Sequence, residues 1–376
     1  MNILKLTSLS EGTLRNKKKT IKIFSLLFII VLLSKYIKGK IKTKQISFNL
    51  SQKSLNQYKI DEKFIENLKN VLNSDEIFEN EMMNKHTTFR TGGLAKIFVK
   101  PKTINQLIQI IQLCNKYKIY FFVIGNGSNL LISDKGYNGV IIQIKEDNFS
   151  DLKIIKNEGN NFLLKVGGGM LMRTLSIESC LLSLTGLEDI IDIPGTVGGG
   201  IIMNASFKKT GLYKPLFKVK VITPDGNIME LNKEECKLVS RGSMLKDKNY
   251  IVIEAIFKLK KGDQMKIQKQ MTENTKMRYR KQPMYFGSAG SFFKWDHKKY
   301  GSMHEKYKES GIVGYKVGNA MIYTDNISFI VNLGKATSTQ IMEIVNQIEK
   351  IMKENYNINI EREVIVIGPF NDILYY

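Results

Sequence analysis

The sequence is poor in the residue types that mark metal sites and disulfide-bonded folds. Its 376 residues include three cysteines, three histidines, six prolines and one tryptophan. Cys114, Cys180 and Cys236 lie far apart and form no CxxC pair, which argues against a zinc site or a disulfide framework. We therefore expect buried free thiols and no bound metal ion.

Acidic residues are scarce in the N-terminal part of the chain. Residues 1–60 contain thirteen Lys and Arg side chains and one acid, Glu11, so they contribute +12 to the total charge of +22. The rest of the chain carries +10 without a dense basic stripe that alternates with aromatic residues. We therefore expect no nucleic-acid partner. A basic cleft for an anionic small molecule accounts for this charge equally well.

The N-terminal region also lacks an apolar run long enough for a membrane span. Its apolar run, residues 23–33, is shorter than the about 18 residues that a span needs and fits the core of a signal peptide better. A basic stretch without acids follows, as in a bipartite leader, so we interpret residues 1–60 as a targeting leader to a plastid or an apicoplast-like organelle. The alternative is a membrane anchor facing the cytosol, because lysines flank the run on both sides. A membrane is expected as a partner only through an uncleaved leader.

The rest of the chain has the composition and patterning of a globular α+β protein. Hydrophobic residues make up 43% of the sequence and charged residues 24%, and the length allows two domains. A strand at 95–101, a helix at 103–118 capped by Thr103 and a buried strand at 119–125 predict a right-handed crossover unit. Further helices are predicted at 61–74, 171–183, 263–282 and 337–356, and further strands at 139–144, 161–169, 217–226, 227–232, 250–262, 327–334 and 362–368.

A glycine loop, "GNGSNL", follows the predicted strand at 119–125. Its spacing lacks the third glycine of a dinucleotide-binding fingerprint, and turn signals at 134–139 leave no room for the helix that such a fingerprint must open. We interpret the loop as an anion nest of backbone N–H groups with Ser128 and Asn129 as further donors. From this loop alone, a simple turn is an equally good interpretation.

A second glycine loop, "DIPGTVGGGIIMNA", contains Gly195, Gly198, Gly199 and Gly200 and leads directly into apolar residues. Glycines at this density allow close approach of the backbone to another group. Two such loops, each after an apolar strand, suggest one extended ligand of dinucleotide length. Residues 167–169, "GGG", are a possible third contact, with a turn as their preferred role.

Four motifs in order resemble the UDP-N-acetylenolpyruvoylglucosamine reductases, the flavoenzymes that make UDP-N-acetylmuramate for peptidoglycan. The motifs are "TTFRTGGLAKIFVKPKT", "VIGNGSNLLISDKGYNGVII", "IPGTVGGGIIMNA" and "GSAGSFFK", and the resemblance covers roughly residues 84–368. It is to the compact second type of the family. It implies a vanillyl-alcohol-oxidase (PCMH) type FAD-binding domain at 84–262 and a smaller α+β substrate-binding domain at 263–376, with a helical extension at 61–83.

The resemblance implies FAD as cofactor and NADPH as co-substrate. The first loop is expected to hold the FAD pyrophosphate and the second to lie along the flavin and adenosine. Neither loop contains His or Cys, so the FAD is expected to be non-covalent, with His86 as the one candidate for attachment to exclude. The implied cofactor-binding residues are Gly125, Asn126, Gly127, Ser128, Asn129, Leu130, Ile193, Pro194, Gly195, Thr196, Gly198, Gly199 and Asn204.

The resemblance also implies a catalytic trio, Arg241, Ser291 and Glu363. In the family's reaction, reduced FAD gives a hydride to the enolpyruvyl group. A guanidinium can polarise the substrate carboxylate, a glutamic acid of raised pKa can donate a hydrogen bond to the enolate, and a serine can protonate it. Arg278 and Lys294 match substrate-binding positions, Arg278 near the diphosphate. A UDP-sugar and NADPH are the expected partners, and we expect a monomer.

The chain departs from the family pattern on the substrate side. Asn-Pro after "FFK" is replaced by Trp295-Asp296, the Tyr before the catalytic Arg by Ser240, and a polar contact by Met321. "HANFIVN" becomes "NISFIVN", and Ile365 replaces a basic residue. Two alternatives therefore stay open: an FAD-dependent oxidoreductase of the same scaffold with another carboxylated substrate, and a non-catalytic FAD-binding protein.

Overall fold

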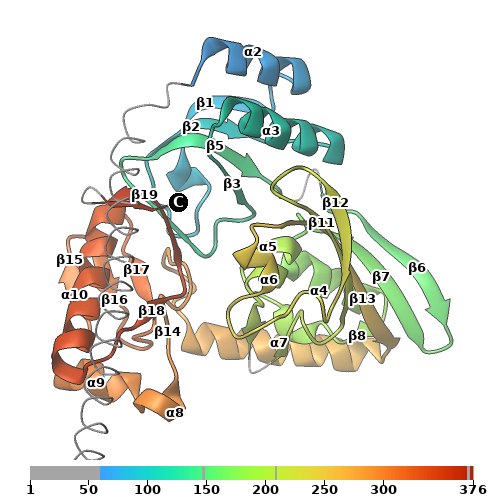
Figure 1. Ribbon diagram of the computed structural model, residues 1–376. Helices are drawn as coiled ribbons and strands as arrows, with labels where there is room; N and C mark the ends of the chain where they lie inside the picture. The colour runs from blue at the N-terminus through green and yellow to red at the C-terminus, as the bar shows by residue number, and fades with distance from the viewer. Residues whose placement is uncertain (1–59, 146–148, 208–209, 371–372, 376) are drawn as a thin grey trace, which may run out of the picture. The chain divides into compact units, whose positions relative to one another are not determined.

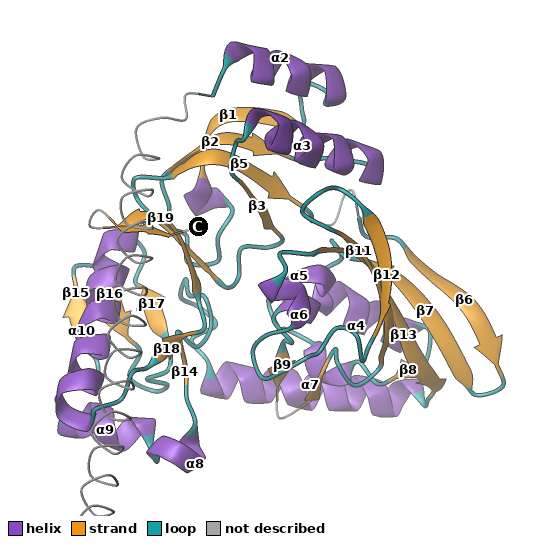
Figure 2. Cartoon of the chain, in the orientation of Figure 1, coloured by secondary structure: helices purple, strands orange, loops and turns teal. Residues whose placement is uncertain are grey.

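The described residues fold into the mixture of helices and strands that the sequence predicts (Figures 1 and 2). The computed structural model describes residues 60–145, 149–207, 210–370 and 373–375. Apart from Ile60, the predicted leader lies outside the described residues. The α+β class is confirmed.

The first sheet has four strands and packs against helix α3 (Ile104–Tyr117). In spatial order the strands are β1 (Ile77–Met82), β2 (Leu94–Val99), β5 (Tyr137–Gln143) and β3 (Phe121–Ile124). β2, β5 and β3 run parallel, as the predicted strand–helix–strand unit requires. Thr103 caps α3 as predicted, because its side chain accepts from the N–H of Gln106 and the Gln106 side chain returns a bond to the backbone of Thr103.

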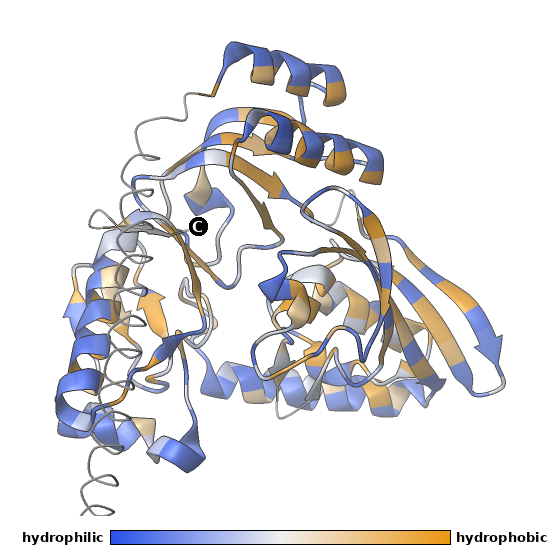
Figure 3. Cartoon of the chain, viewed as in Figure 1, coloured by the Kyte–Doolittle hydropathy of each residue, from blue (hydrophilic) through white to orange (hydrophobic). Residues whose placement is uncertain are grey.

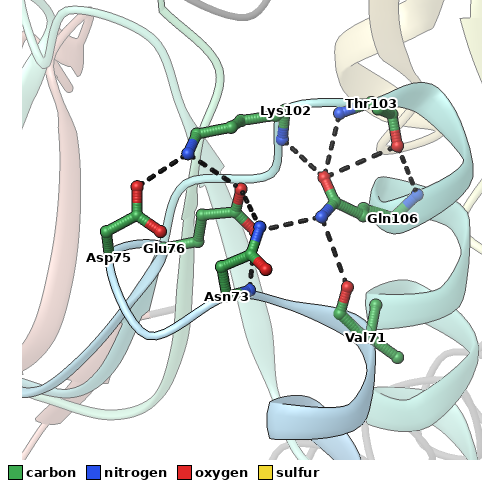
Figure 4. Close-up of polar contacts among 7 residues, drawn as sticks. All are labelled: Val71, Asn73, Asp75, Glu76, Lys102, Thr103 and Gln106. Carbon is green, nitrogen blue, oxygen red and sulfur yellow. Dashed lines mark hydrogen bonds and ion pairs between the residues drawn. The ribbon is translucent and has the colours of Figure 1, made fainter.

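Helix α2 (Glu62–Val71) is fastened to this layer by a polar network around Glu76 (Figure 4). The Glu76 side chain is 1% exposed and lies 3.1 Å from Lys102 Nζ. Its carboxylate also accepts from the backbone N–H of Asn73 at 2.9 Å and from the Gln106 amide at 3.0 Å. The Gln106 amide in turn reaches the carbonyl of Val71 at 3.3 Å, so one carboxylate joins the end of α2 to the start of α3.

The second sheet has six strands, all paired antiparallel. Its path is β12 (Ile228–Asn232), β11 (Leu216–Ile222), β13 (Ile251–Lys261), β7 (Asn161–Gly167) and β6 (Leu152–Glu158), with β8 (Leu184–Thr185) beside the end of β13. The predicted hairpin at Asp225–Gly226 joins β11 to β12. Helix α7 (Gln264–Lys281) packs on α4 (Met172–Leu181) and η3 (Glu188–Ile190), and most of α7 is hydrophilic (Figure 3).

The C-terminal part forms its own core and then returns to the first glycine loop. Its small elements are β14 (Phe293–Lys294), β15 (Lys316–Val317), β16 (Ala320–Ile322), β17 (Ile330–Asn332) and β18 (Glu361–Arg362), with α10 (Ser338–Tyr356) packed on β15 and β16. The last strands are β19 (Ile365–Phe370) and β20 (Ile373–Tyr375). β19 pairs parallel with β4 (Leu130–Ile132), the strand that starts where the first glycine loop ends.

The remaining short elements have no counterpart in the sequence prediction. They are η1 (Met83–Lys85), α5 (Val197–Ile202), β9 (Ser206–Phe207), β10 (Thr210–Gly211), α6 (Met244–Asp247), α8 (His297–Tyr300) and α9 (Met303–Glu309). One prediction of burial is wrong: three of the four β3 residues are only half-buried, because β3 is an edge strand of its sheet. Cys114, Cys180 and Cys236 are buried free thiols, as predicted. Among the described residues, no helix combines the length and the apolar character that crossing a membrane requires.

Candidate active site

The first glycine loop, residues 125–130, is a turn between β3 and β4, and no helix follows it. This confirms the argument against a dinucleotide-binding helix. Gly127 has φ +62°, and a Cβ there would overlap the carbonyl oxygen of His86. A Cβ on Gly125 would overlap the side chain of Thr196 in the second loop. Both glycines are therefore required by close packing.

The backbone of the first loop offers a run of hydrogen-bond donors. The N–H groups of Asn126, Gly127, Ser128 and Asn129 have no acceptor among the residues that the structure describes. Successive N–H groups left free in a turn form a concave site for an anion such as a phosphate. This geometry supports the anion-nest interpretation over the simple turn.

The second glycine loop, residues 193–204, contains the short helix α5 capped by Thr196. It meets the first loop directly, because Ser128 Oγ donates to the carbonyl of Pro194 at 3.0 Å. Residues 167–169 form the expected turn. They contact α5 directly, because the N–H of Gly198 donates to the carbonyl of Gly168 at 2.8 Å. The structure thus brings both predicted glycine loops together.

Unpaired polar groups at the two loops fit the polar groups of a dinucleotide such as FAD. Asn204 Oδ1 is buried and accepts no hydrogen bond from any described residue, so it is an unsatisfied acceptor that a ligand could pair with. Together, this oxygen and the free N–H groups of the first loop offer an acceptor and several donors to the polar groups of such a ligand.

The structure brings Arg241 and Glu363 into contact. Arg241 Nε lies 3.3 Å from Glu363 Oε1, and the Glu363 side chain is 14% exposed. Asn129 of the first loop donates its side-chain amide to the backbone carbonyl of Glu363 at 3.0 Å. The glutamate is therefore positioned directly by the loop that offers the anion nest.

Ser291 lies on the neighbouring segment of the same site. The N–H of Glu363 donates to the carbonyl of Phe292, the next residue after Ser291, at 2.8 Å. Ser291 is half-buried, and its hydroxyl has no partner among the described residues. The segments that carry the predicted trio thus come together from three distant parts of the chain.

On balance, the surroundings of Glu363 shift its equilibrium towards the protonated form. Burial raises the pKa of Glu363, and the nearby charges of Arg241, Lys294 and Lys246 oppose this shift without cancelling it. Lys294 Nζ also lies 3.2 Å from Glu361 Oε2. A carboxylic acid that stays protonated can donate a hydrogen bond, which an ordinary carboxylate cannot.

Arg278 is buried next to the second loop, close to Phe207 and Asp192. It is 5% exposed, its Nε has no partner among the described residues, and its guanidinium lies 5.0 Å from the ring centre of Phe207. Burial lowers the pKa of Arg278 to about 10, against the charge of Asp192. No contact joins Arg278 to Glu363 within the described part of the chain.

Two other residues singled out in the sequence have partners of their own. His86 Nε2 lies 2.9 Å from Glu81 Oε1, and its ring packs on Phe98 with centres 4.2 Å apart. Trp295 donates its indole N–H to the carbonyl of Gly301 at 2.9 Å. Both side chains are thus oriented by interactions within the protein.

Sequence reasoning assigned no role to Thr88 or Lys246. Thr88 joins two predicted segments, because its N–H donates to Gly127 O at 3.2 Å and its hydroxyl donates to Ser288 O at 2.6 Å. Lys246 lies on α6, shortly after Arg241 in the chain, and its charge interacts with that of Glu363. The glycines after Thr88 gave a weak signal for a tight turn, whereas nothing distinguished Lys246 from the many other lysines.

Comparison with known proteins agrees with this architecture. A family described as an FAD binding domain matches residues 95–232, and one described as the C-terminal domain of UDP-N-acetylenolpyruvoylglucosamine reductase matches residues 282–367. Fold and site therefore define a flavoprotein with a PCMH-type FAD-binding domain followed by a reductase C-terminal domain.

Curated relatives and a solved structure specify the family. UDP-N-acetylenolpyruvoylglucosamine reductase from Lachnoclostridium phytofermentans is 35% identical over 304 residues, 81% of this chain and 97% of the relative. The enzyme of the same name from Clostridium botulinum is 35% identical over 300 residues, 80% of this chain and 95% of the relative. The structure of the reductase from Thermus caldophilus matches with TM-score 0.63 and 30% identity, over 76% of this chain and 97% of that one. The chain belongs to the UDP-N-acetylenolpyruvoylglucosamine reductase family.

The predicted location in a plastid or an apicoplast-like organelle is wrong. The relatives that the chain matches over most of their length come from bacteria, which have no such organelles. The basic, acid-free composition of residues 12–60 was therefore a misleading signal.

Proposed function

We propose that the chain reduces the enolpyruvyl group of UDP-N-acetylglucosamine enolpyruvate to UDP-N-acetylmuramate, with NADPH as reductant and non-covalently bound FAD as cofactor. The observation that carries the proposal is the contact between Arg241 and the half-buried Glu363, which lies beside an anion nest and next to the segment of Ser291. We expect the protein to act as a monomer whose FAD-binding and substrate-binding domains meet near residue 262.

The two glycine loops would hold the cofactor. The N–H groups of residues 126–129 would bind its diphosphate, and residues 193–204 would lie along its rings. Bound FAD would supply transfer of a hydride equivalent from NADPH to the terminal carbon of the enolpyruvyl group. His86 is occupied by Glu81, which supports a cofactor held without a covalent bond.

Arg241 and Glu363 would act on the substrate carboxylate. A guanidinium offers parallel N–H groups to a carboxylate and so draws electron density from the neighbouring double bond. As negative charge develops there, a protonated Glu363 would donate a hydrogen bond to it, and both donors would stabilise the transition state more than the ground state.

Ser291 would complete the reaction by protonation. Addition of hydride at the terminal carbon leaves an electron pair at the neighbouring carbon, in conjugation with the carboxylate. The Ser291 hydroxyl would transfer its proton to that carbon, because an enolate is basic enough to take it. Solvent then returns a proton to the serine, and the product leaves with two more hydrogens than the substrate. Arg278 and Lys294 would bind the charged groups of the nucleotide portion.

The proposal is tested by NADPH oxidation under steady-state conditions. The purified full-length protein should oxidise NADPH rapidly only when the enolpyruvyl nucleotide is present, and mass spectrometry should find UDP-N-acetylmuramate in equal amount to the NADPH consumed. A protein that binds FAD and oxidises NADPH only with another carboxylated acceptor would support the alternative substrate. A protein that binds FAD but supports neither reaction would support a non-catalytic role.

A further inference from the structure

Lys246 lies on a short helix that is fastened to the second glycine loop. Its backbone N–H donates to Ser243 Oγ at 3.2 Å, which caps α6. The same hydroxyl is buried and donates to the carbonyl of Ile202 on α5 at 2.8 Å. Since Arg241 lies on the preceding turn, one anchored segment carries both cations.

The side chain of Lys246 is half-buried and lies close enough to Glu363 for the two charges to interact. The charged groups that act on it are Lys294, Asp247 and Glu363. Burial lowers the pKa of Lys246 and the charge of Lys294 lowers it further, whereas Asp247 and Glu363 act in the opposite direction. Its ammonium forms no ion pair or hydrogen bond with any residue that the structure describes.

Among the groups here that are not fully exposed, the cations outnumber the carboxyl groups. Arg241, Lys246 and Lys294, which we call the cation cluster, all act on the one carboxyl group of Glu363, and burial favours the neutral form of that group. Lys294 has an additional partner in Glu361, whose side chain is 75% exposed. A half-buried ammonium without a partner beside two other cations is unfavourable for folding, and such conflicts concentrate at functional sites.

We propose that Lys246 binds the carboxylate of the enolpyruvyl group together with Arg241, and stabilises the negative charge that this carboxylate gains when the substrate is reduced. This assignment rests on the proposed function. Arg241 supplies a planar pair of donors, whereas Lys246 supplies a compact charge that needs no fixed orientation. Lys246 is thus a further catalytic residue, in contact with the group on which charge develops.

The proposal is tested by binding to the full-length, FAD-loaded, oxidised protein. Calorimetry would measure the affinity for UDP-N-acetylmuramate, which carries the carboxylate, and for UDP-N-acetylglucosamine, which does not. Lys246→Met should reduce the ratio of these two affinities about tenfold or more, since a lost charged hydrogen bond has that effect. Lys246→Arg should lower the affinity ratio less than Lys246→Met does. Lys248→Met changes an exposed lysine beside α6 and should leave the ratio at its wild-type value.

Thermal unfolding separates binding from a structural role. Without nucleotide, Lys246→Met should unfold at the wild-type temperature or above it, because the change removes repulsion within the cation cluster. Addition of UDP-N-acetylmuramate should raise the unfolding temperature of the variant less than that of the wild type. If Lys246→Met unfolds at a lower temperature than the wild type, or keeps the wild-type affinity ratio, the assignment of Lys246 is wrong, but the proposed function still stands. Wild-type protein that binds no UDP-N-acetylmuramate overturns the proposed function as well.

Discussion

Arg241 Nε lies 3.3 Å from Glu363 Oε1, a contact between two residues that are far apart in the chain. Arg241 has φ +58°, a conformation that non-glycine residues adopt rarely and that costs free energy. Its turn is held by an antiparallel bridge between Val239 and Gly242 and by the Asn204 amide, which donates to the carbonyl of Val239 at 2.8 Å. The second glycine loop therefore fixes the arginine that contacts Glu363.

Replacement of Ser291 by Ala should separate the two half-reactions. The variant should be reduced by NADPH at the wild-type rate, because the serine has no role in that step. Reoxidation by the enolpyruvyl nucleotide should slow by about 100-fold or more, the usual contribution of a positioned proton donor. Stopped-flow absorbance of the flavin measures both steps, and Ser288→Ala is the matched control. Equal slowing of both steps would contradict the assignment of Ser291 as proton donor.

Replacement of Glu363 by Gln should change the pH dependence of turnover. Burial raises the pKa of Glu363, so the acid donates a hydrogen bond up to a higher pH than an ordinary glutamate could. In the wild type, kcat/KM should therefore fall as the pH rises through this raised pKa. The amide of Gln donates at every pH, so the variant should be slower but should lose that decline. If kcat/KM of Glu363→Gln still falls with rising pH as in the wild type, the decline is caused by the titration of another group.

The titration of Glu363 should also make the stability of the fold fall as the pH rises. Because the pKa of Glu363 is raised in the folded state, its contribution is fully present below the ordinary glutamate pKa. That contribution is lost as the pH rises through the folded-state value. The free energy of unfolding, measured in denaturant across this range, should decline less with rising pH in Glu363→Gln than in the wild type. Parallel curves for the two proteins would show that the carboxyl is not perturbed by burial.

Replacement of Gly127 by Ala should abolish binding of FAD. Gly127 has φ +62°, and its new Cβ would overlap the carbonyl oxygen of His86, so the loop must move. Gly159 is the matched control, since it has φ +60° with nothing within 4 Å of an added Cβ. Gly159→Ala should cost only the backbone strain, about 1–2 kcal/mol, and retain the flavin. The measurement is the ratio of bound flavin to protein after gel filtration of each variant. Equal flavin content in both variants would contradict this account of the loop.

Replacement of Glu76 by Gln should weaken the attachment of α2 and reduce sensitivity to acid. Burial alone would raise the pKa of Glu76, but hydrogen bonds from Asn73 and the contact with Lys102 lower it on balance. Its contribution is therefore present at neutral pH and is lost as the pH falls through the lowered value. Glu76→Gln should cost about 1–3 kcal/mol of unfolding free energy at neutral pH and less in acid.

Asp75→Asn is the control for this change, because Asp75 contacts the same lysine at 2.7 Å but its side chain is 68% exposed. An exposed ion pair contributes little to stability, because solvent and salt screen the two charges. Chemical denaturation at two pH values measures both variants. Equal costs for Glu76→Gln and Asp75→Asn would show that burial of the carboxylate is unimportant.

Sequence patterns predicted the long elements well because local signals determine them. The apolar spacing and the Thr103 cap located α3, and alternating residues and a turn located the β11–β12 hairpin. Burial of β3 was misjudged, since the place of a strand within a sheet depends on pairings between distant residues. Helix α5 was missed because its three glycines are poor helix formers, and packing against β13 overrides that preference.

The candidate site was predictable only as separate motifs. Glycine patterns indicated two loops, but their contact through Ser128 and Pro194 depends on the folded arrangement. The pairing of Arg241 with Glu363 likewise comes from the fold. Lys246 could not be selected from the sequence, because its distinction is burial among other cations.

The most direct test of the account is reoxidation of the reduced flavin without oxygen. The full-length protein is bleached with one equivalent of NADPH under anaerobic conditions and then mixed with the enolpyruvyl nucleotide. We predict that the flavin absorbance returns completely and that one equivalent of UDP-N-acetylmuramate forms. A flavin that stays bleached until oxygen is admitted would contradict the proposed reaction.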